Sequence, residues 1–160
     1  MQILAKKAGI FGMVGGQAAD VKSEKNGGAL TKDMLIFIHE NKTAALIEAS
    51  MMIGAVLAGA SEKDIHDMET AANNIGLAFQ IQDDILDITS TSEELGKPVG
   101  SDEKNNKLTY VKLHGLEESK KMVKTLSEEA IAILQQIADD NRADGSFLMT
   151  LTQTLISREN

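Results

Sequence analysis

The most informative segment of the chain is Gln80-Ile81-Gln82-Asp83-Asp84-Ile85-Leu86-Asp87. Phe79 precedes it and Ile88 follows it, so the segment is expected to pack as a buried helix. Asp83 and Asp87 are four residues apart and project from one helix face, with Asp84 one position round. Three buried like charges are costly unless a cation compensates them, and oxygen ligands without cysteine or a nearby histidine suit Mg²⁺. The cluster therefore predicts a magnesium site, and the alternative is a solvated acidic helix face.

Composition limits the classes of protein that fit. The chain has 160 residues, 42% hydrophobic and 25% charged, which is ample for one globular domain. Its net charge is −8 and no basic stripe alternates with aromatic residues, so nucleic acid is not an expected partner. The absence of cysteine excludes disulfides and thiolate metal sites. No apolar run approaches ~18 residues and no signal-peptide pattern is seen, so we expect a cytoplasmic protein without a transmembrane segment.

The rest of the chain also reads as helices, which predicts an all-α fold class. No stretch alternates long enough for a strand, and Pro98 is the only proline. Ser61 is expected to cap the long central helix, with Asp64 at the third position of a capping box. The expected helices run from Met1 to about Val21, from Thr31 to Gly59 with a break near Glu40-Asn41, from Ser61 to about Ile88, from about Lys107 to Leu113, from about Leu116 to Ala138, and from about Gly145 to Ser157.

Small residues mark two further candidate positions. An interior glycine costs a helix about 1 kcal/mol, so a glycine-rich helix predicts close approach of another helix or a ligand. The glycines of the first expected helix are Gly9, Gly12, Gly15 and Gly16. Gln17 and Asp20 follow them, and Lys42-Thr43 opens a nearly apolar stretch. Taken alone, Lys42 reads as a surface lysine and Asp20 as a helix-end carboxylate.

The connection after the acidic helix carries two lysines. It contains Leu95-Gly96-Lys97-Pro98-Val99-Gly100-Ser101-Asp102 and then Asn106-Lys107. Lysine suits phosphate oxygens, so Lys97 and Lys107 are candidates for a ligand held by the carboxylates, and an ordinary surface loop is the alternative. The Walker pattern is absent, which argues against a P-loop. His39, His66 and His114 match no ligand spacing and are expected at the surface.

Together these motifs resemble one known family. Phe79-Gln80-x-x-Asp83-Asp84-x-x-Asp87, followed by Gly96-Lys97 and Gly100-Ser101-Asp102, is similar to the second aspartate-rich region of the trans-prenyltransferases, the polyprenyl or farnesyl diphosphate synthases. Gly16-Gln17-x-x-Asp20 and Lys42-Thr43 match other marks of that family in the same order. The resemblance implies a helical bundle of the isoprenoid synthase type.

The resemblance also implies an activity, which is Mg²⁺-dependent head-to-tail condensation of an allylic diphosphate with isopentenyl diphosphate. This prenyl chain elongation is of the farnesyl or geranylgeranyl type. Metals draw off the allylic diphosphate and the resulting carbocation is attacked by isopentenyl diphosphate. The implied metal residues are Asp83, Asp84 and, in support, Asp87. The implied catalytic residues are Lys42, Lys97 and Asp83. The implied substrate-binding residues are Gln17, Lys42, Thr43, Gln80, Lys97 and Lys107.

One departure from the family pattern limits these expectations. The first aspartate-rich motif and the basic residues that bind isopentenyl diphosphate are not found in this sequence. Residues 1–160 are therefore expected to be the C-terminal part of a synthase domain, inactive alone and oligomeric through exposed apolar surface. The alternatives are a non-catalytic helical subunit that binds another synthase chain and a generic bundle with an incidental acidic patch. A terpene cyclase fits less well because its second metal motif is not seen.

Overall fold

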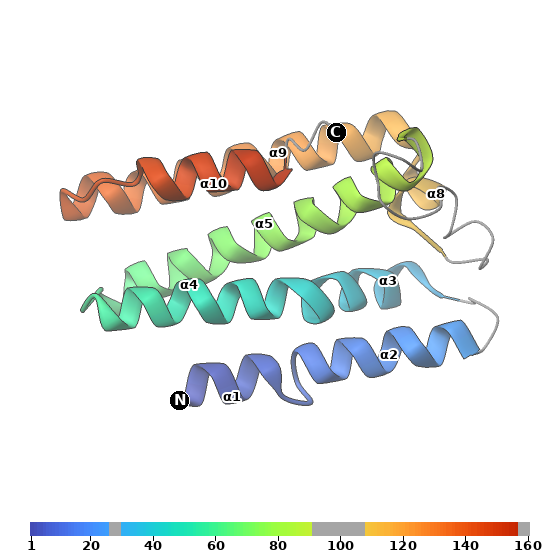
Figure 1. Ribbon diagram of the computed structural model, residues 1–160, viewed down its shortest axis with the longest axis horizontal. Helices are drawn as coiled ribbons and strands as arrows, with labels where there is room; N and C mark the ends of the chain where they lie inside the picture. Colours follow the sequence, from blue (N-terminus) through green and yellow to red (C-terminus); the bar gives the residue numbers. More distant parts are fainter. Residues whose placement is uncertain (26–29, 91–107, 157–160) are drawn as a thin grey trace.

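The computed structural model describes residues 1–25, 30–90 and 108–156, and every regular element in these ranges is a helix. The predicted all-α class is therefore confirmed. The helices lie side by side in layers, and the first two helices of the chain follow one another along one edge of the bundle (Figure 1). In chain order they are α1 (Gln2–Ala8), α2 (Met13–Lys25), α3 (Lys32–His39), the π-helix η1 (Glu40–Ala44), α4 (Ala45–Leu57), α5 (Glu62–Thr89), α8 (Tyr110–His114), α9 (Leu116–Asn141) and α10 (Ser146–Ile156).

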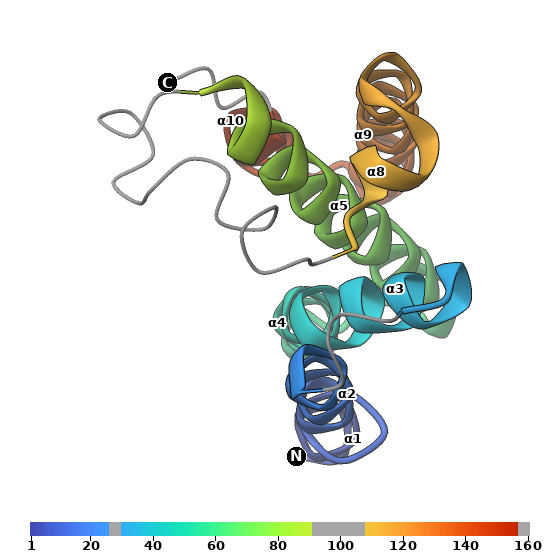
Figure 2. The same cartoon turned by 90° about the vertical axis from the view of Figure 1, so that its right-hand side faces the viewer.

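The long helix α5 runs through the middle of the bundle. It packs against α4 on one side and α9 on the other, as the end-on view in Figure 2 shows. Two of the fully buried side chains of α5 are the small ones of Ala71 and Ala78. Small buried side chains let packed helices approach closely. The larger core side chains around them include Leu35, Ile75, Ile81, Ile85, Leu126, Leu134 and Ile156. None of the helices in the described ranges has the length and apolarity needed to cross a bilayer.

Hydroxyl side chains fix where three of the helices begin. Ser61 Oγ accepts a hydrogen bond from the Asp64 amide at 3.1 Å and donates one to its carboxylate at 2.8 Å, which confirms the predicted cap. Thr31 Oγ1 accepts from the Met34 amide at 3.2 Å in the same way. Thr109 caps α8 by accepting from the Lys112 amide at 3.2 Å. These caps therefore set the first residues of α3, α5 and α8.

The first expected helix is interrupted, so the prediction of one continuous helix there was wrong. α1 ends at Ala8, and the amides of Gly12 and Val14 both donate to the Gly9 carbonyl, at 3.0 and 3.2 Å. Glycine gains little from the helical conformation and permits this turn. The break leaves Ile10 and Phe11 exposed at 70% and 83%.

The helix that starts at Lys32 changes character at Glu40, where the sequence predicted a break. Five residues form the π-helix η1, and α4 then continues to Leu57. This π-helix packs closely against α2 and α5, at one glycine of each helix. A Cβ placed on Gly16 of α2 would lie 2.5 Å from the Lys42 amide nitrogen, and one on Gly76 of α5 would lie 2.5 Å from the Ala44 Cα. A π-turn widens the helix locally and is frequent at functional sites, and here it carries Lys42 and Thr43.

A charged cluster joins α1 to the middle of the bundle. The Lys7 ammonium contacts the carboxylates of Glu48 on α4 and Glu69 on α5, the latter at 2.5 Å. Asn73 Nδ2 also donates to Glu48 Oε1 at 2.8 Å. Burial alone would lower the pKa of Lys7, but its hydrogen bonds to the two carboxylates outweigh burial and raise that pKa. The Lys7 ammonium therefore ties α1 to α4 and α5.

Candidate functional site

A small polar cavity of about 220 Å³ lies where α2, α3, η1 and α5 meet. We refer to it as the polar cavity. Its lining residues are Asp20, Leu30, Leu35, Ile38, His39, Lys42, Thr43, Gln80, Asp83 and Asp84. The structure therefore brings together five of the site residues predicted from the sequence, namely Lys42, Thr43, Gln80, Asp83 and Asp84.

An ion pair forms one wall of the polar cavity. Lys42 Nζ lies 2.5 Å from Asp20 Oδ2, and the Asp20 residue is only 2% exposed. About a third of the Lys42 side chain stays accessible to solvent. The second carboxylate oxygen, Asp20 Oδ1, is buried and has no hydrogen-bond partner within the described part of the chain. A buried acceptor of this kind favours an additional donor or cation in the cavity.

The opposite wall is one face of α5. Gln80, Asp83 and Asp84 stand at spacings of three and four residues and so share that face. Gln80 and Asp83 are half-buried, whereas Asp84 is 9% exposed. Asp84 Oδ2 accepts a hydrogen bond from the Tyr110 amide at 2.7 Å and lies 4.0 Å from His39 Nε2. The two adjacent aspartates thus occupy different surroundings.

His39 was predicted to lie at the surface, and this prediction was wrong. His39 is 5% exposed and lines the polar cavity. The signal that could have found it is the apolar stripe of α3. Leu35 is buried, and His39, four residues further on, falls on the same side of the helix as Leu35. By contrast, His66 is exposed as expected.

Several predicted site residues are not part of the polar cavity. Asp87 is 1% exposed, packed inside the bundle, and does not line it. Gln17 is exposed on α2 and lines a different hollow. Lys97 and Lys107 fall outside the described residues. Within the described ranges no three carboxylate or histidine side chains are grouped closely enough to hold a metal ion, so the metal roles stay predictions.

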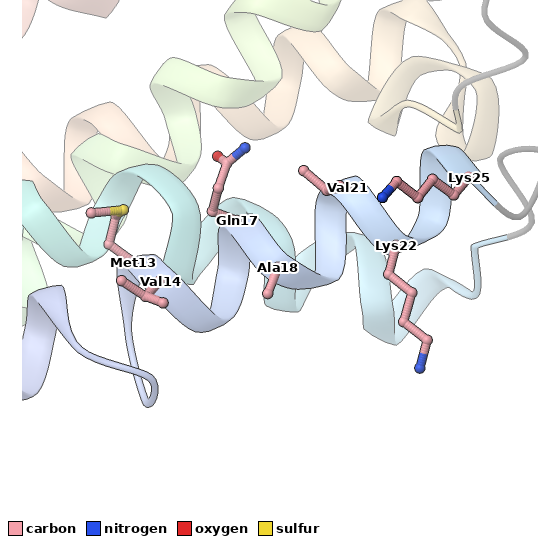
Figure 3. A pocket seen from close by; sticks show the side chains of 7 residues that line it. All are labelled: Met13, Val14, Gln17, Ala18, Val21, Lys22 and Lys25. Carbon is pink, nitrogen blue, oxygen red and sulfur yellow. The ribbon is translucent and has the colours of Figure 1, made fainter.

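The hollow beside Gln17 is an apolar groove along α2, with a volume of about 580 Å³ (Figure 3). Its lining side chains form two rows on neighbouring sides of the helix, and the rows are Met13, Gln17, Val21 and Lys25, and Val14, Ala18 and Lys22. Val14 and Val21 are 47% and 38% exposed. The groove is therefore apolar along most of α2, with lysines at its carboxyl end.

The donor atoms around the polar cavity fit a hard cation. Asp83 and Asp20 offer carboxylate oxygens and Gln80 an amide oxygen as possible ligands, and no cysteine exists in the chain. Mg²⁺ prefers oxygen ligands and keeps several water molecules, which can donate to an acceptor such as Asp20 Oδ1. Lys42 adds a positive charge at the same place, which suits the phosphate oxygens of a metal-bound ligand.

Comparison with known proteins gives concordant results. The family model for polyprenyl synthetase matches residues 1–144. The chain is 46% identical over 149 residues to a geranylgeranyl diphosphate synthase of Cyanophora paradoxa, and the match covers 93% of this chain and 48% of that protein. It is 41% identical over 157 residues to a chloroplastic geranylgeranyl pyrophosphate synthase of Capsicum annuum, with 98% and 42% covered.

The same similarity extends to solved structures. A geranyltransferase of Helicobacter pylori, crystallised with magnesium and isoprenyl diphosphate, superimposes with a TM-score of 0.81 at 34% sequence identity. The superposition covers 98% of this chain and 51% of that chain. The chain therefore spans about half the length of the proteins that it matches.

Proposed function

Because this chain belongs to the polyprenyl synthetase family, we propose that it serves in Mg²⁺-dependent, head-to-tail elongation of a prenyl diphosphate, as a prenyltransferase. The observation that carries the proposal is the polar cavity, in which η1 and α5 bring Lys42, Thr43, Gln80 and Asp83 to one place. The chain supplies the second aspartate-rich region of such an enzyme. Its proposed substrates are an allylic diphosphate and isopentenyl diphosphate.

Each residue of the polar cavity has a proposed task. Asp83, half-buried at the cavity wall, is the carboxylate that we assign to Mg²⁺, which when bound stabilises the departing diphosphate. Lys42 neutralises phosphate charge, and the buried Asp20 holds its ammonium in place at 2.5 Å. Thr43 and Gln80 contribute hydrogen bonds to the same ligand. Lys97 and Lys107 keep their predicted role as further diphosphate contacts.

Two predicted site residues need a different account. Asp87 is buried away from the polar cavity, so its supporting role would act through the packing of α5. Gln17 is exposed on the apolar groove of α2 and does not line the polar cavity, so its substrate-binding role stays a prediction. Exposed apolar residues along α1, α2 and the turn between them support the predicted homo-oligomer. They are Leu4, Ile10, Phe11, Val14 and Val21. The cytoplasmic location stays a prediction, since the Capsicum annuum relative is named chloroplastic.

A chimera tests the proposed function. The part of the Cyanophora paradoxa synthase that the match leaves uncovered would be fused in front of this chain, and elongation of geranyl diphosphate would be assayed with and without Mg²⁺. We expect Mg²⁺-dependent product from the chimera, a loss on the order of 100-fold in its Asp83→Asn variant, and no product from the chain alone. A folded but inactive chimera would contradict the proposal and favour the non-catalytic subunit. Product from the chain alone would contradict its predicted inactivity.

A further inference from the structure

We propose that Gly16 is a positioning residue for the Lys42 ammonium. Because Gly16 has no side chain, α2 lies directly on the backbone of η1, and this close approach brings the Asp20 carboxylate of α2 within reach of Lys42. The effect of Gly16 on this ion pair does not depend on any ligand. Its consequence for diphosphate binding rests on the proposed function.

The contact between α2 and η1 leaves no room for a side chain at Gly16. A Cβ placed there would lie 2.5 Å from the Lys42 amide nitrogen and 2.8 Å from both the carbonyl carbon and the Cβ of Asn41. Two of these atoms belong to the backbone of η1 and the third is bonded directly to it, so none of them can rotate away. Since a closely packed interior cannot absorb a further methyl group in place, any larger residue requires α2 and η1 to separate.

The π-helix η1 cannot retreat from α2, because α5 lies beyond it. Figure 2 shows the layer of α3 and α4, which η1 joins, between α2 and α5. A Cβ on Gly76 of α5 would lie 2.5 Å from the Ala44 Cα, so η1 is already in close contact with α5. Separation would therefore displace α2 together with Asp20, while η1 and Lys42 stay against α5.

The buried face of α2 consists of small and polar residues. They are Gly16, Asp20 and Ser23, which share one face because they are spaced by four and three residues. Ser23 Oγ donates to the Asp20 carbonyl oxygen at 2.8 Å, so this hydroxyl is satisfied within α2. The whole of α2 lies in the described ranges, and none of its apolar residues is buried. The helix therefore meets η1 through the Gly16 contact and the Asp20 side chain.

The Asp20 side chain connects this contact to the Lys42 ammonium. Asp20 follows Gly16 by about one helical turn, so its side chain leaves α2 next to the point of closest approach. Lys42 Nζ lies 2.5 Å from Asp20 Oδ2. A charge-assisted hydrogen bond weakens sharply towards about 3.5 Å, so a displacement of α2 by about 1 Å would largely remove it.

Double-mutant cycles on urea unfolding of the full chain test this role. Each cycle combines Lys42→Met with Asp20→Asn, and the coupling is the factor by which their effects on the unfolding equilibrium constant fail to multiply. The cycle is measured in the unaltered chain, in Gly16→Ala, and in the control Gly54→Ala, whose new Cβ meets nothing within 4 Å. A purely structural role of Gly16 would lower stability without changing the coupling.

We expect a coupling of about tenfold or more in the unaltered chain and in Gly54→Ala, and of about twofold or less in Gly16→Ala. Equal coupling in a folded Gly16→Ala chain would overturn the proposal. If Gly16→Ala does not fold alone, the cycle is run in trimethylamine N-oxide, which favours compact states. A variant that stays unfolded even then would make Gly16 a requirement for folding instead of a positioning residue, which would also overturn the proposal.

Calorimetric titration of inorganic pyrophosphate with Mg²⁺ tests the consequence for ligand binding. We expect Gly16→Ala to bind about tenfold more weakly than the unaltered chain, and Gly54→Ala to bind within about twofold of it. Unchanged affinity in a Gly16→Ala chain that has lost the coupling would refute this consequence. If the unaltered chain binds no pyrophosphate, the proposed function fails, while the double-mutant cycles still decide the role of Gly16.

Discussion

Replacing Gly76 with alanine is expected to lower the free energy of unfolding by about 3 kcal/mol. A Cβ at this position would lie 2.4 Å from the Ala44 Cβ and 2.5 Å from the Ala44 Cα, both far inside contact distance. Neither atom can rotate away, because the Cα belongs to the backbone of η1 and the Cβ is bonded directly to it. The helices α5 and η1 would have to separate, and η1 carries the residues of the polar cavity. Urea unfolding followed by circular dichroism measures the change.

Gly54 provides the matched control, since it is also a helical glycine of this bundle. A Cβ there meets nothing within 4 Å, and the residue is exposed on α4. Gly54→Ala is therefore expected to stabilise the protein by about 0.5–1 kcal/mol through helix propensity alone. Equal effects of the two substitutions would show that the close packing of α5 on η1 is not real.

Replacing Lys42 with methionine is expected to destabilise the unliganded chain by about 3 kcal/mol. The substitution keeps most of the side-chain volume but removes the ammonium that lies 2.5 Å from Asp20 Oδ2. Asp20, only 2% exposed, would then be a buried carboxylate without its cation. We take the low end of the usual range for broken buried pairs, because Lys42 is partly accessible to solvent. Urea unfolding without ligand is again the measurement.

The double variant Lys42→Met, Asp20→Asn separates this effect from the loss of packing. With both charges removed, no stranded carboxylate remains, and the free energy of unfolding should recover most of the loss seen in Lys42→Met. If the losses of the two single variants simply add in the double variant, Lys42 and Asp20 are not coupled. The assignment of Asp20 as the residue that holds Lys42 would then be wrong.

Local sequence signals were enough to predict the central helix of the fold. The start of α5 follows from the Ser61 cap, and its length follows from an uninterrupted apolar periodicity up to Ile88. These signals act within a few residues of the chain. The same is true of the Thr31 cap of α3. The all-α class and the spacing of Gln80, Asp83 and Asp84 on one helix face were therefore predictable.

Features that depend on contacts between distant segments were not predictable. The π-helix η1 fits between Gly16 and Gly76, which lie 60 residues apart in the sequence, and no local pattern specifies its register. The hydrogen bond of Tyr110 to Asp84 depends on where α8 packs after residues 91–107. The glycines were expected to mark close approach, but the sequence could not show that Gly9 and Gly12 form a turn whereas Gly16 stays helical.

Calorimetric titration of geranyl diphosphate into the chain tests whether the polar cavity holds a magnesium-bound diphosphate. The titration is run with and without Mg²⁺ and repeated with the Asp83→Asn variant, whose fold is checked by circular dichroism. We predict binding that requires Mg²⁺ and is lost in Asp83→Asn. Binding that is equal in the two proteins, or equal with and without Mg²⁺, would contradict the assignment of the polar cavity as a magnesium–diphosphate site.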